Sequence, residues 1–277
     1  MNSILSASGD LQRSRGSRII SKAQMETPVI LVEGMLEHRI LQKRWHSPAT
    51  GDRTNIEIEF PEEGAGKTAV IEEYTHRRWN GNVFALVDMD YDFSRQLLPD
   101  DPNIFDTAPL VTLPSHAIKS SKSQKSALMT LSSGIDLLEE NSKQILRVAR
   151  ALTIVKLFKG SEGTKTTFGN LNWMEIDFSF EKGEEFNAHI FEMELGEQHL
   201  ASVQAFVKHH QHQLNGCGIN DHMMFHAWSL CYEGHFPDVS PKVLRSFEKG
   251  FFEPFIIDAI GRQKNDIVDQ IRAAILS

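Results

Sequence analysis

The segment Val83-Phe-Ala-Leu-Val-Asp88-Met-Asp90-Tyr-Asp92 decides the fold that we predict for this chain. Its first five residues are apolar, which is typical of a strand buried on both faces of a parallel sheet. The acidic residues Asp88, Asp90 and Asp92 then follow at alternate positions. Because ligands of open α/β sheets bind beyond the carboxyl ends of the strands, we expect a functional site here. On this segment alone, an acidic turn at the start of a helix explains the pattern equally well.

A second apolar run that ends in an acid favours the functional interpretation. Pro28-Val-Ile-Leu-Val-Glu33-Gly34 predicts a short strand followed by a turn into a helix. If the two strands are neighbours, Glu33 faces Asp88 and Asp90 across one crevice. Carboxylates packed so closely repel one another unless a cation neutralises them, and their hard oxygen atoms suit Mg²⁺, with Mn²⁺ as the alternative.

The residues between and after these runs predict an α/β fold. Apolar side chains at helical spacing indicate helices over 35–45 and 68–79, and strict alternation indicates a strand over 55–60. Further strand character lies within 103–113, around 104–105 and 110–112. The order β-α-β-α-β predicts a right-handed parallel sheet flanked by helices.

Pro61-Glu-Glu-Gly64-Ala-Gly66-Lys67-Thr68 lies between a strand and a helix, as a phosphate-binding loop would. It has Pro61 where the first glycine of such a loop belongs, and two acids beside it would repel a polyphosphate. We therefore interpret the segment as a tight turn that presents Lys67 to the carboxylate crevice, where it could stabilise transition-state charge.

The C-terminal part has a different character. Helical patterns over 136–158, 199–213 and 254–275 predict a mainly helical domain over 116–277. Residues 171–195 fit either a hairpin or a strand followed by a helix. At the other end, residues 1–27 form a basic segment with a short predicted helix over 11–22, which we interpret as a solvated face rather than a phosphate contact.

Two further patterns carry weaker functional indications. Residues 107–135 contain no Asp or Glu but include Lys119, Lys122 and Lys125, so this loop is either a phosphate-backbone contact or a surface linker. His222 and His226 have the spacing of a metal-binding pair on a helix. No third ligand is evident in the sequence, so we favour a structural role for both histidines.

Composition limits the classes of protein to consider. The chain has 277 residues and a net charge of −8, and this negative charge argues against a protein that coats nucleic acid through bulk charge. Its two cysteines give no disulfide framework. The sequence has neither the apolar core of a signal peptide nor a stretch that approaches a membrane span. We expect a soluble cytoplasmic protein without a membrane partner.

The two predicted strands that end in acidic residues resemble those of the Toprim domain, which topoisomerases, primases and several nucleases share. The resemblance covers about residues 28–115 and rests on Val-Glu33-Gly34 and Asp88-Met-Asp90. Gly66-Lys67 and the late segment Cys231-Tyr-Glu-Gly-His235-Phe make the layout similar to the AriB-type Toprim effectors of PARIS anti-phage systems. The resemblance therefore implies a Toprim-like sheet over 28–115.

The resemblance implies a metal-dependent nuclease, acting as a toxin on transfer RNA. Asp88 and Asp90 would hold the metal ion, Asp92 would be an outer or second-metal ligand, and Glu33 would be a general base or shared ligand. AriB-type effectors are held silent by an ATPase partner of the AriA type, and pair as a homodimer once released.

Other functions remain open on the sequence alone. A DNA nuclease of the Toprim/OLD type would use the same acids, and a non-catalytic Toprim binding module would tolerate their loss. A topoisomerase would need a nucleophilic tyrosine on a separate domain, and a primase would need zinc or nucleotide-binding modules that the sequence does not indicate.

Overall fold

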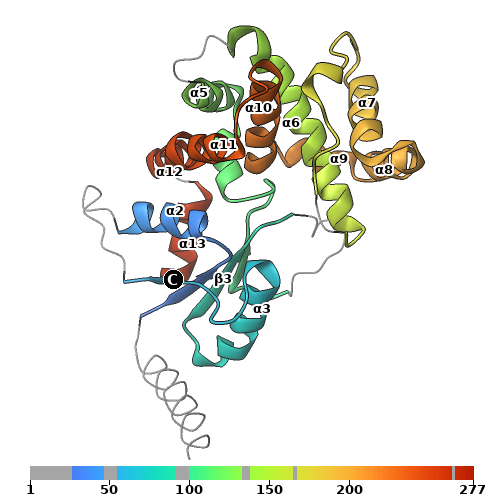
Figure 1. Cartoon of the computed structure of the whole chain (residues 1–277). Coiled ribbons are helices and arrows are strands. Elements are labelled where there is room, and N and C mark those ends of the chain that lie inside the picture. The colour runs from blue at the N-terminus through green and yellow to red at the C-terminus, as the bar shows by residue number, and fades with distance from the viewer. Residues whose placement is uncertain (1–26, 47–54, 91–99, 133–137, 165–166, 264–265) are drawn as a thin grey trace, which may run out of the picture.

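The computed structural model describes residues 27–46, 55–90, 100–132, 138–164, 167–263 and 266–277. The predicted helix over 11–22 and the predicted metal ligand Asp92 lie outside these residues. Within them the chain forms a small sheet with helices on both faces and a larger group of helices beside it (Figure 1).

The sheet is parallel, as the sequence predicts. Its four strands lie in the order β2-β1-β3-β4, and their bounds are β1 Val29–Val32, β2 Glu57–Glu59, β3 Val83–Val87 and β4 Ile104–Asp106. β1 pairs with β3 in a register that sets Val32 opposite Leu86. From β1 the chain turns to one side into β2, whereas β3 leads to β4 on the other side. The carboxyl ends of β1 and β3 therefore lie at the point where the strand order reverses, which is where ligands of such sheets bind.

Alternate residues of the central strands belong to different cores. Ile30, Val32, Phe84 and Leu86 join the main buried cluster. The residues between them face α3 (Gly66–Arg77), which contributes Val70 and Tyr74 to a smaller buried cluster. All five residues of β3 are buried, which accounts for its unbroken apolar sequence.

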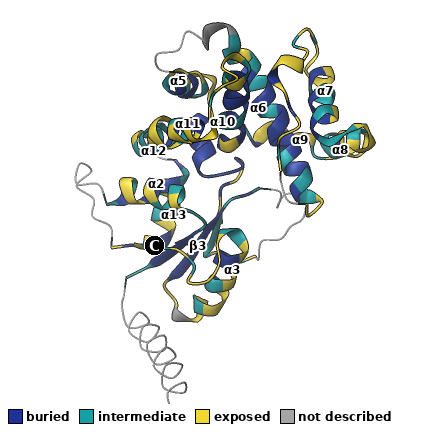
Figure 2. Ribbon diagram, viewed as in Figure 1, coloured by how far each residue is buried: buried dark blue, intermediate teal, exposed yellow. Residues whose placement is uncertain are grey.

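The helices of the C-terminal part pack around a central pair, α6 and α10, which Figure 2 shows to be largely buried. Between β4 and α6 lie a 3₁₀ turn, η3 (Pro114–Ile118), and a short helix. The remaining helices have these bounds: α2 Met35–Trp45, α5 Ser121–Leu131, α6 Leu138–Ser161, α7 Gly183–Leu195, α8 Glu197–His209, α9 Gln211–Gly216, α10 Asp221–His235, α11 Pro241–Phe247, α12 Glu253–Arg262 and α13 Ile267–Leu276. Shorter turns are η2 Arg78–Asn80, η4 Trp173–Glu175 and the π-helical turn η5 Glu248–Phe252.

Several sequence expectations are wrong in detail. Residues 110–112 are not a strand, because this segment turns back over the end of β3. The acid-free segment after β4 is not a loop, since it folds into η3 and α5. Residues 171–195 contain η4 and α7 and no strand. The predicted terminal helix is two helices, α12 and α13, with Asp266 capping the second through hydrogen bonds from Val268 and Asp269.

One buried cluster joins the sheet to the helices that follow it. It runs from β1 and α2 through α6 and α10 to α13. The C-terminal helices also return to the sheet, because α12 and α13 pack against α2 through Lys43–Asp258 and Arg44–Asp269. Helices of the C-terminal part thus pack against the part of the chain that forms the sheet, while the predicted boundary at residues 115 and 116 stays a prediction.

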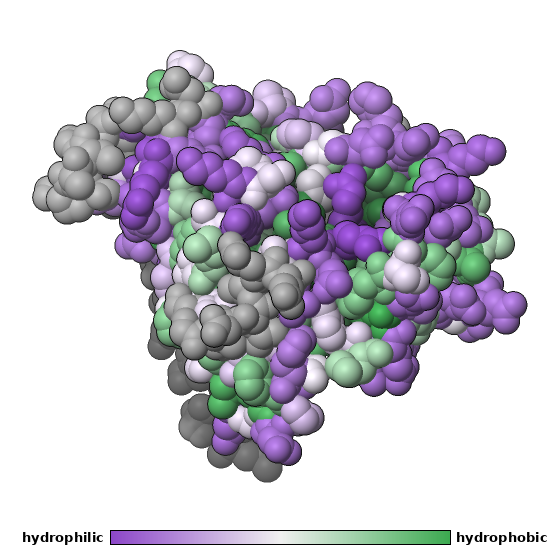
Figure 3. Space-filling model, turned by 90° about the horizontal axis from the view of Figure 1, so that it is seen from above, coloured by the Kyte–Doolittle hydropathy of each residue, from purple (hydrophilic) through white to green (hydrophobic). Residues whose placement is uncertain are grey.

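The face of the molecule seen from above is mainly polar (Figure 3). Figure 3 shows hydrophilic residues over much of the face seen from above, with smaller hydrophobic areas between them. Among the described residues, no helix combines the length and the apolar character that crossing a membrane requires.

Candidate functional site

Glu33 and Asp88 meet at the carboxyl ends of the two central strands. Each residue directly follows its strand, Glu33 after β1 and Asp88 after β3. The Glu33 Oε1 atom accepts a hydrogen bond from the Asp88 backbone N–H at 2.7 Å. Two residues 55 positions apart are therefore joined directly, because parallel neighbouring strands end at the same edge of the sheet.

The turn after β3 is held by the segment that follows β4. The Asp88 Oδ1 atom accepts a hydrogen bond from the Leu113 backbone N–H at 3.2 Å. The Met89 N–H donates to Thr107 Oγ1 at 2.9 Å, and the Asp90 N–H donates to the Val111 carbonyl at 3.1 Å. Asp90 has a φ of 43°, a left-handed conformation that is uncommon for residues other than glycine. These contacts hold Asp90 in that conformation and direct its carboxylate into the crevice beside Glu33.

Lys67 reaches the same crevice from the start of α3. The turn before it uses Gly64 and Gly66 with φ values of 82° and 80°, a conformation in which other residues are strained. A Cβ atom on Gly66 would lie only 4.0 Å from Glu33 Oε2, so the turn runs directly beside that carboxylate. Lys67 Nζ lies 3.3 Å from the Met89 carbonyl and 3.8 Å from Asp90 Oδ2.

Two further carboxylates belong to this site, and the sequence alone did not point to either. Glu37 is in the first turn of α2, and its Oε2 atom lies 2.7 Å from where a Cβ atom on Gly34 would be. Asp221, the first residue of α10, is buried and accepts hydrogen bonds from Thr112 Oγ1 at 2.6 Å and Ser115 Oγ at 3.4 Å. Glu37 could have been found as an acid one helical turn after Glu33, whereas no local pattern marks Asp221.

A second lysine enters the site from the C-terminal part. Lys156 Nζ, on the half-buried side of α6, lies 3.6 Å from Asp90 Oδ1. Lys67 of α3 and Lys156 of α6 therefore approach different oxygen atoms of one carboxylate. The site is composite, with strands and α3 on one side and α6 and α10 on the other.

Burial and mutual repulsion raise the pKa values of the acids in this crevice. The pKa of Asp88 is raised well above its usual range, first by burial and then by the charges of Glu37, Glu33, Asp90 and Asp221. Burial raises the pKa of Glu33 to about 7, against the opposing effects of the Asp88 N–H and Lys67. Burial and the charge of Asp221 raise the pKa of Glu37. A cation bound among these acids would remove the repulsion.

The donor atoms suit a hard divalent cation in kind, although they do not surround one point. All five acids offer carboxylate oxygens, the ligands that Mg²⁺ and Mn²⁺ prefer. No three His, Cys, Asp or Glu side chains among the described residues are gathered closely enough to hold a metal ion. Since Lys67 and Lys156 approach Asp90, binding a cation requires these side chains to reorient. The acids thus suit a divalent cation by the chemistry of their oxygen atoms and by their charge, but not by their arrangement in this structure.

The other residues singled out in the sequence lie outside the crevice. Lys119, Lys122 and Lys125 are exposed on α5 and the residues before it. The His226 ring lies 5.8 Å from that of Phe168, and burial lowers its pKa. His222 instead lies 3.8 Å from both Asp221 and Glu248, and these acids raise its pKa to about 9, so that it is a cation at the rim of the site.

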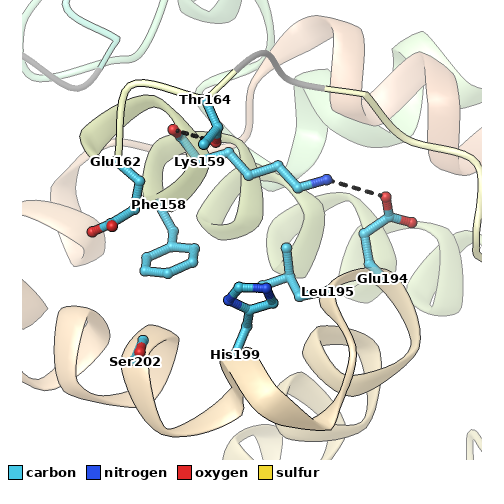
Figure 4. A pocket seen from close by; sticks show the side chains of 8 residues that line it. All are labelled: Phe158, Lys159, Glu162, Thr164, Glu194, Leu195, His199 and Ser202. Carbon is cyan, nitrogen blue, oxygen red and sulfur yellow. Dashed lines mark hydrogen bonds and ion pairs between the residues drawn. The ribbon is translucent and has the colours of Figure 1, made fainter.

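A pocket of about 310 Å³ lies between the end of α6 and the helices α7 and α8 (Figure 4). Its main polar groups already pair with one another: Lys159 Nζ lies 3.4 Å from the buried Glu194 carboxylate and 2.6 Å from the Thr167 carbonyl. The Glu194 carboxylate also accepts from the Asn170 N–H at 3.4 Å. We assign this cluster to the packing of α6 on α7.

Comparison with known proteins found neither a family model that matches the chain nor a curated relative. The case for the function therefore rests on the geometry of the crevice.

Proposed function

We propose that this protein is a metal-dependent nuclease, a Toprim-like enzyme that hydrolyses phosphodiester bonds. One observation carries the proposal: Glu33 and Asp88 are hydrogen-bonded at 2.7 Å where the strand order reverses, with further acids and two lysines directed at the same place. A cluster of partly buried acids destabilises a fold unless a cation is bound. Binding of a functional cation would account for the presence of such a cluster.

Each residue has a role in this proposal. Asp88 and Asp90, with Glu37 or Asp221, would hold Mg²⁺ or Mn²⁺, which when bound supplies an activated water and charge relief at the phosphate. The Glu33 carboxyl, whose pKa is about 7, can take up a proton from the attacking water near neutral pH. Lys67 and Lys156 are positioned to stabilise negative charge on the phosphate as it develops.

The proposed substrate is RNA, and transfer RNA in particular. This assignment follows from the resemblance to AriB-type effectors of PARIS systems, as do an ATPase partner of the AriA type and a homodimer as the active form. A cytoplasmic location is proposed because the two cysteines give no disulfide framework. Regulation by such a partner would suit a nuclease that is toxic when free.

The test is cleavage by the purified protein. We expect it to cut total transfer RNA in Mg²⁺ or Mn²⁺ but not in EDTA. We expect Asp88→Asn and Glu33→Gln each to lower the rate by about 100-fold or more, because each removes a group that takes part in the chemical step. Glu72→Gln, a change of an exposed acid on the outer side of α3, is the matched control and should keep the wild-type rate.

The possible results separate the alternatives. Cleavage of DNA with intact RNA would assign the protein to DNA nucleases of the Toprim/OLD type. Equal growth arrest on expression of wild type and Glu33→Ala would overturn the catalytic proposal, since a released nuclease should be toxic only with its acids intact. If the folded protein cleaves neither RNA nor DNA, the non-catalytic binding module is the alternative that remains.

A further inference from the structure

An exposed basic surface lies beside the crevice. It comprises cations of α5 and of the residues just before it, of α11 and of η5, and we call it the α5–η5 surface. Its members are Lys119, Lys122, Lys125, Lys242, Arg245 and Lys249. None of them forms an ion pair with a described carboxylate, whereas Lys43, Arg44 and Arg77 elsewhere on the protein do. The chain as a whole has a net charge of −8, so the positive charge of this surface differs from the charge of the whole protein.

The elements that carry these cations are neighbours. α5 packs directly against η5, which continues from α11 (Figure 1). On α5, Lys122, Lys125 and Met129 are exposed at the spacing of one helical face, opposite the buried Ala127, Leu128 and Leu131. The face of α5 that is directed to solvent is thus cationic.

Apolar side chains are interleaved with these cations. Phe251 of η5 is 43% exposed, two residues after Lys249, and its ring lies 5.7 Å from that of Phe247. Met129 of α5 is 58% exposed. Cations beside an exposed aromatic ring are features with which proteins bind single-stranded nucleic acid, because lysines contact phosphates and a ring can stack on an unpaired base.

A direct line of contacts leads from this surface to the acids. Glu248, the first residue of η5, lies 3.8 Å from His222 Nδ1, and His222 Nε2 lies 3.8 Å from Asp221 Oδ2. Thr112, which donates to Asp221 Oδ1 at 2.6 Å, directly precedes Leu113, whose backbone N–H donates to Asp88. These contacts join the α5–η5 surface to the crevice.

We propose that the α5–η5 surface binds unpaired RNA and leads it into the acidic crevice. The inference rests on the proposed nuclease function and extends it, since it assigns the substrate a single-stranded segment and a direction of approach. An acidic crevice repels a polyanion, so a separate cationic surface is needed to hold the substrate. The exposed ring of Phe251 favours unpaired bases over a duplex, whose bases are already stacked.

Binding of a fluorescein-labelled 20-nucleotide unstructured RNA tests the inference. The titration is made in EDTA, so that binding is measured without cleavage. We expect Lys122→Glu/Lys125→Glu to weaken binding by about tenfold or more at 0.1 M salt, and to reduce the salt dependence by about 0.7 per lost phosphate contact. Phe251→Ala should weaken binding severalfold and leave the salt dependence unchanged, because it removes stacking and no charge.

Lys208→Glu is the matched control, since Lys208 is an exposed lysine on α8, outside this surface. It should bind RNA as the wild type does. Equal loss in Lys208→Glu and in the α5 variant would mean that only net charge matters, and would overturn the proposal. Tighter binding of a hairpin duplex of the same length than of the unpaired RNA would also overturn it.

The two proposals fail in different ways. Cleavage that depends on Asp88 but is indifferent to the α5 variant would overturn the RNA-binding surface and keep the nuclease. RNA binding that is lost in the α5 variant, without cleavage in Mg²⁺ or Mn²⁺, would keep the surface and overturn the nuclease.

Discussion

Glu33 illustrates how a single residue can cost stability and still be needed. Its pKa is raised from about 4.5 to about 7, so the folded state holds this proton more tightly than the unfolded state does. The stability that comes from the protonated form is present below pH 4.5 and is lost as the pH rises through 7. In the absence of metal, ionised Glu33 therefore destabilises the fold at alkaline pH.

The neutral variant Glu33→Gln should reverse this effect. Its amide oxygen can still accept from the Asp88 N–H, while the buried charge is gone. In EDTA at pH 8 we expect the variant to be more stable than the wild type by on the order of 2 kcal/mol, and this gain should shrink towards pH 4.5. Urea unfolding at the two pH values measures it. If Glu33→Gln is less stable than the wild type at pH 8, the surroundings stabilise the ionised form of Glu33, contrary to this expectation.

At the scale of elements, helices far along the chain complete the crevice. α6 supplies Lys156 and α10 supplies Asp221, and both are more than 60 residues beyond Asp90. Each side chain is positioned by helix packing, since α6 and α10 form the central pair of the helical part. A sheet domain without these helices would therefore lack part of the site.

The variant Lys156→Ala tests this composite arrangement. We expect cleavage to fall by about 10²-fold, because a cation directed at the developing charge is lost. Binding of Mn²⁺ should stay the same or become tighter, since a positive charge near Asp90 has been removed. Lys143→Ala, an exposed lysine on the same helix, is the control. Parallel loss of metal binding and cleavage would give Lys156 a structural role instead.

The strands and their acids could be predicted from sequence, whereas the helical contributors could not. A parallel sheet needs short apolar strands linked by helices, and such strands end at one edge, so Glu33 and Asp88 follow from local patterns. Asp221 begins a helix that looks like any other amphipathic segment, and its neighbours Thr112 and Ser115 are 109 and 106 residues away. No spacing rule in the sequence connects them.

For the whole molecule, the docking of the C-terminal helices on α2 holds the two parts of the site together. Arg44 of α2 donates to both oxygens of Asp269 in α13, at 3.2 and 2.7 Å, and to the Gly261 carbonyl of α12 at 3.1 Å. Glu37 lies in the first turn of the same α2. The helix that offers a carboxylate to the crevice is thus fixed at its other end by the last helices of the chain.

Removing this contact should loosen the docking. We expect Arg44→Ala to lower the free energy of unfolding by about 2 kcal/mol, since a partly buried, bidentate, charge-assisted contact is lost. Arg39→Ala, at the 52% exposed end of the Arg39–Glu253 pair, should cost less than about 0.5 kcal/mol. Chemical denaturation of both variants compares them. If both variants lower the free energy of unfolding equally, the Arg44–Asp269 contact stabilises the fold no more than an exposed ion pair does.

The central claim is that Asp88 and the acids gathered around it at the carboxyl end of β3 bind a divalent cation, and calorimetric titration with Mn²⁺ tests it most directly. We predict that the wild type binds Mn²⁺ at pH 7.5, that Asp88→Asn weakens binding by about tenfold or more, and that Glu72→Gln has no effect. Equal affinity in the wild type and Asp88→Asn, or no binding by the folded wild type, would contradict the account.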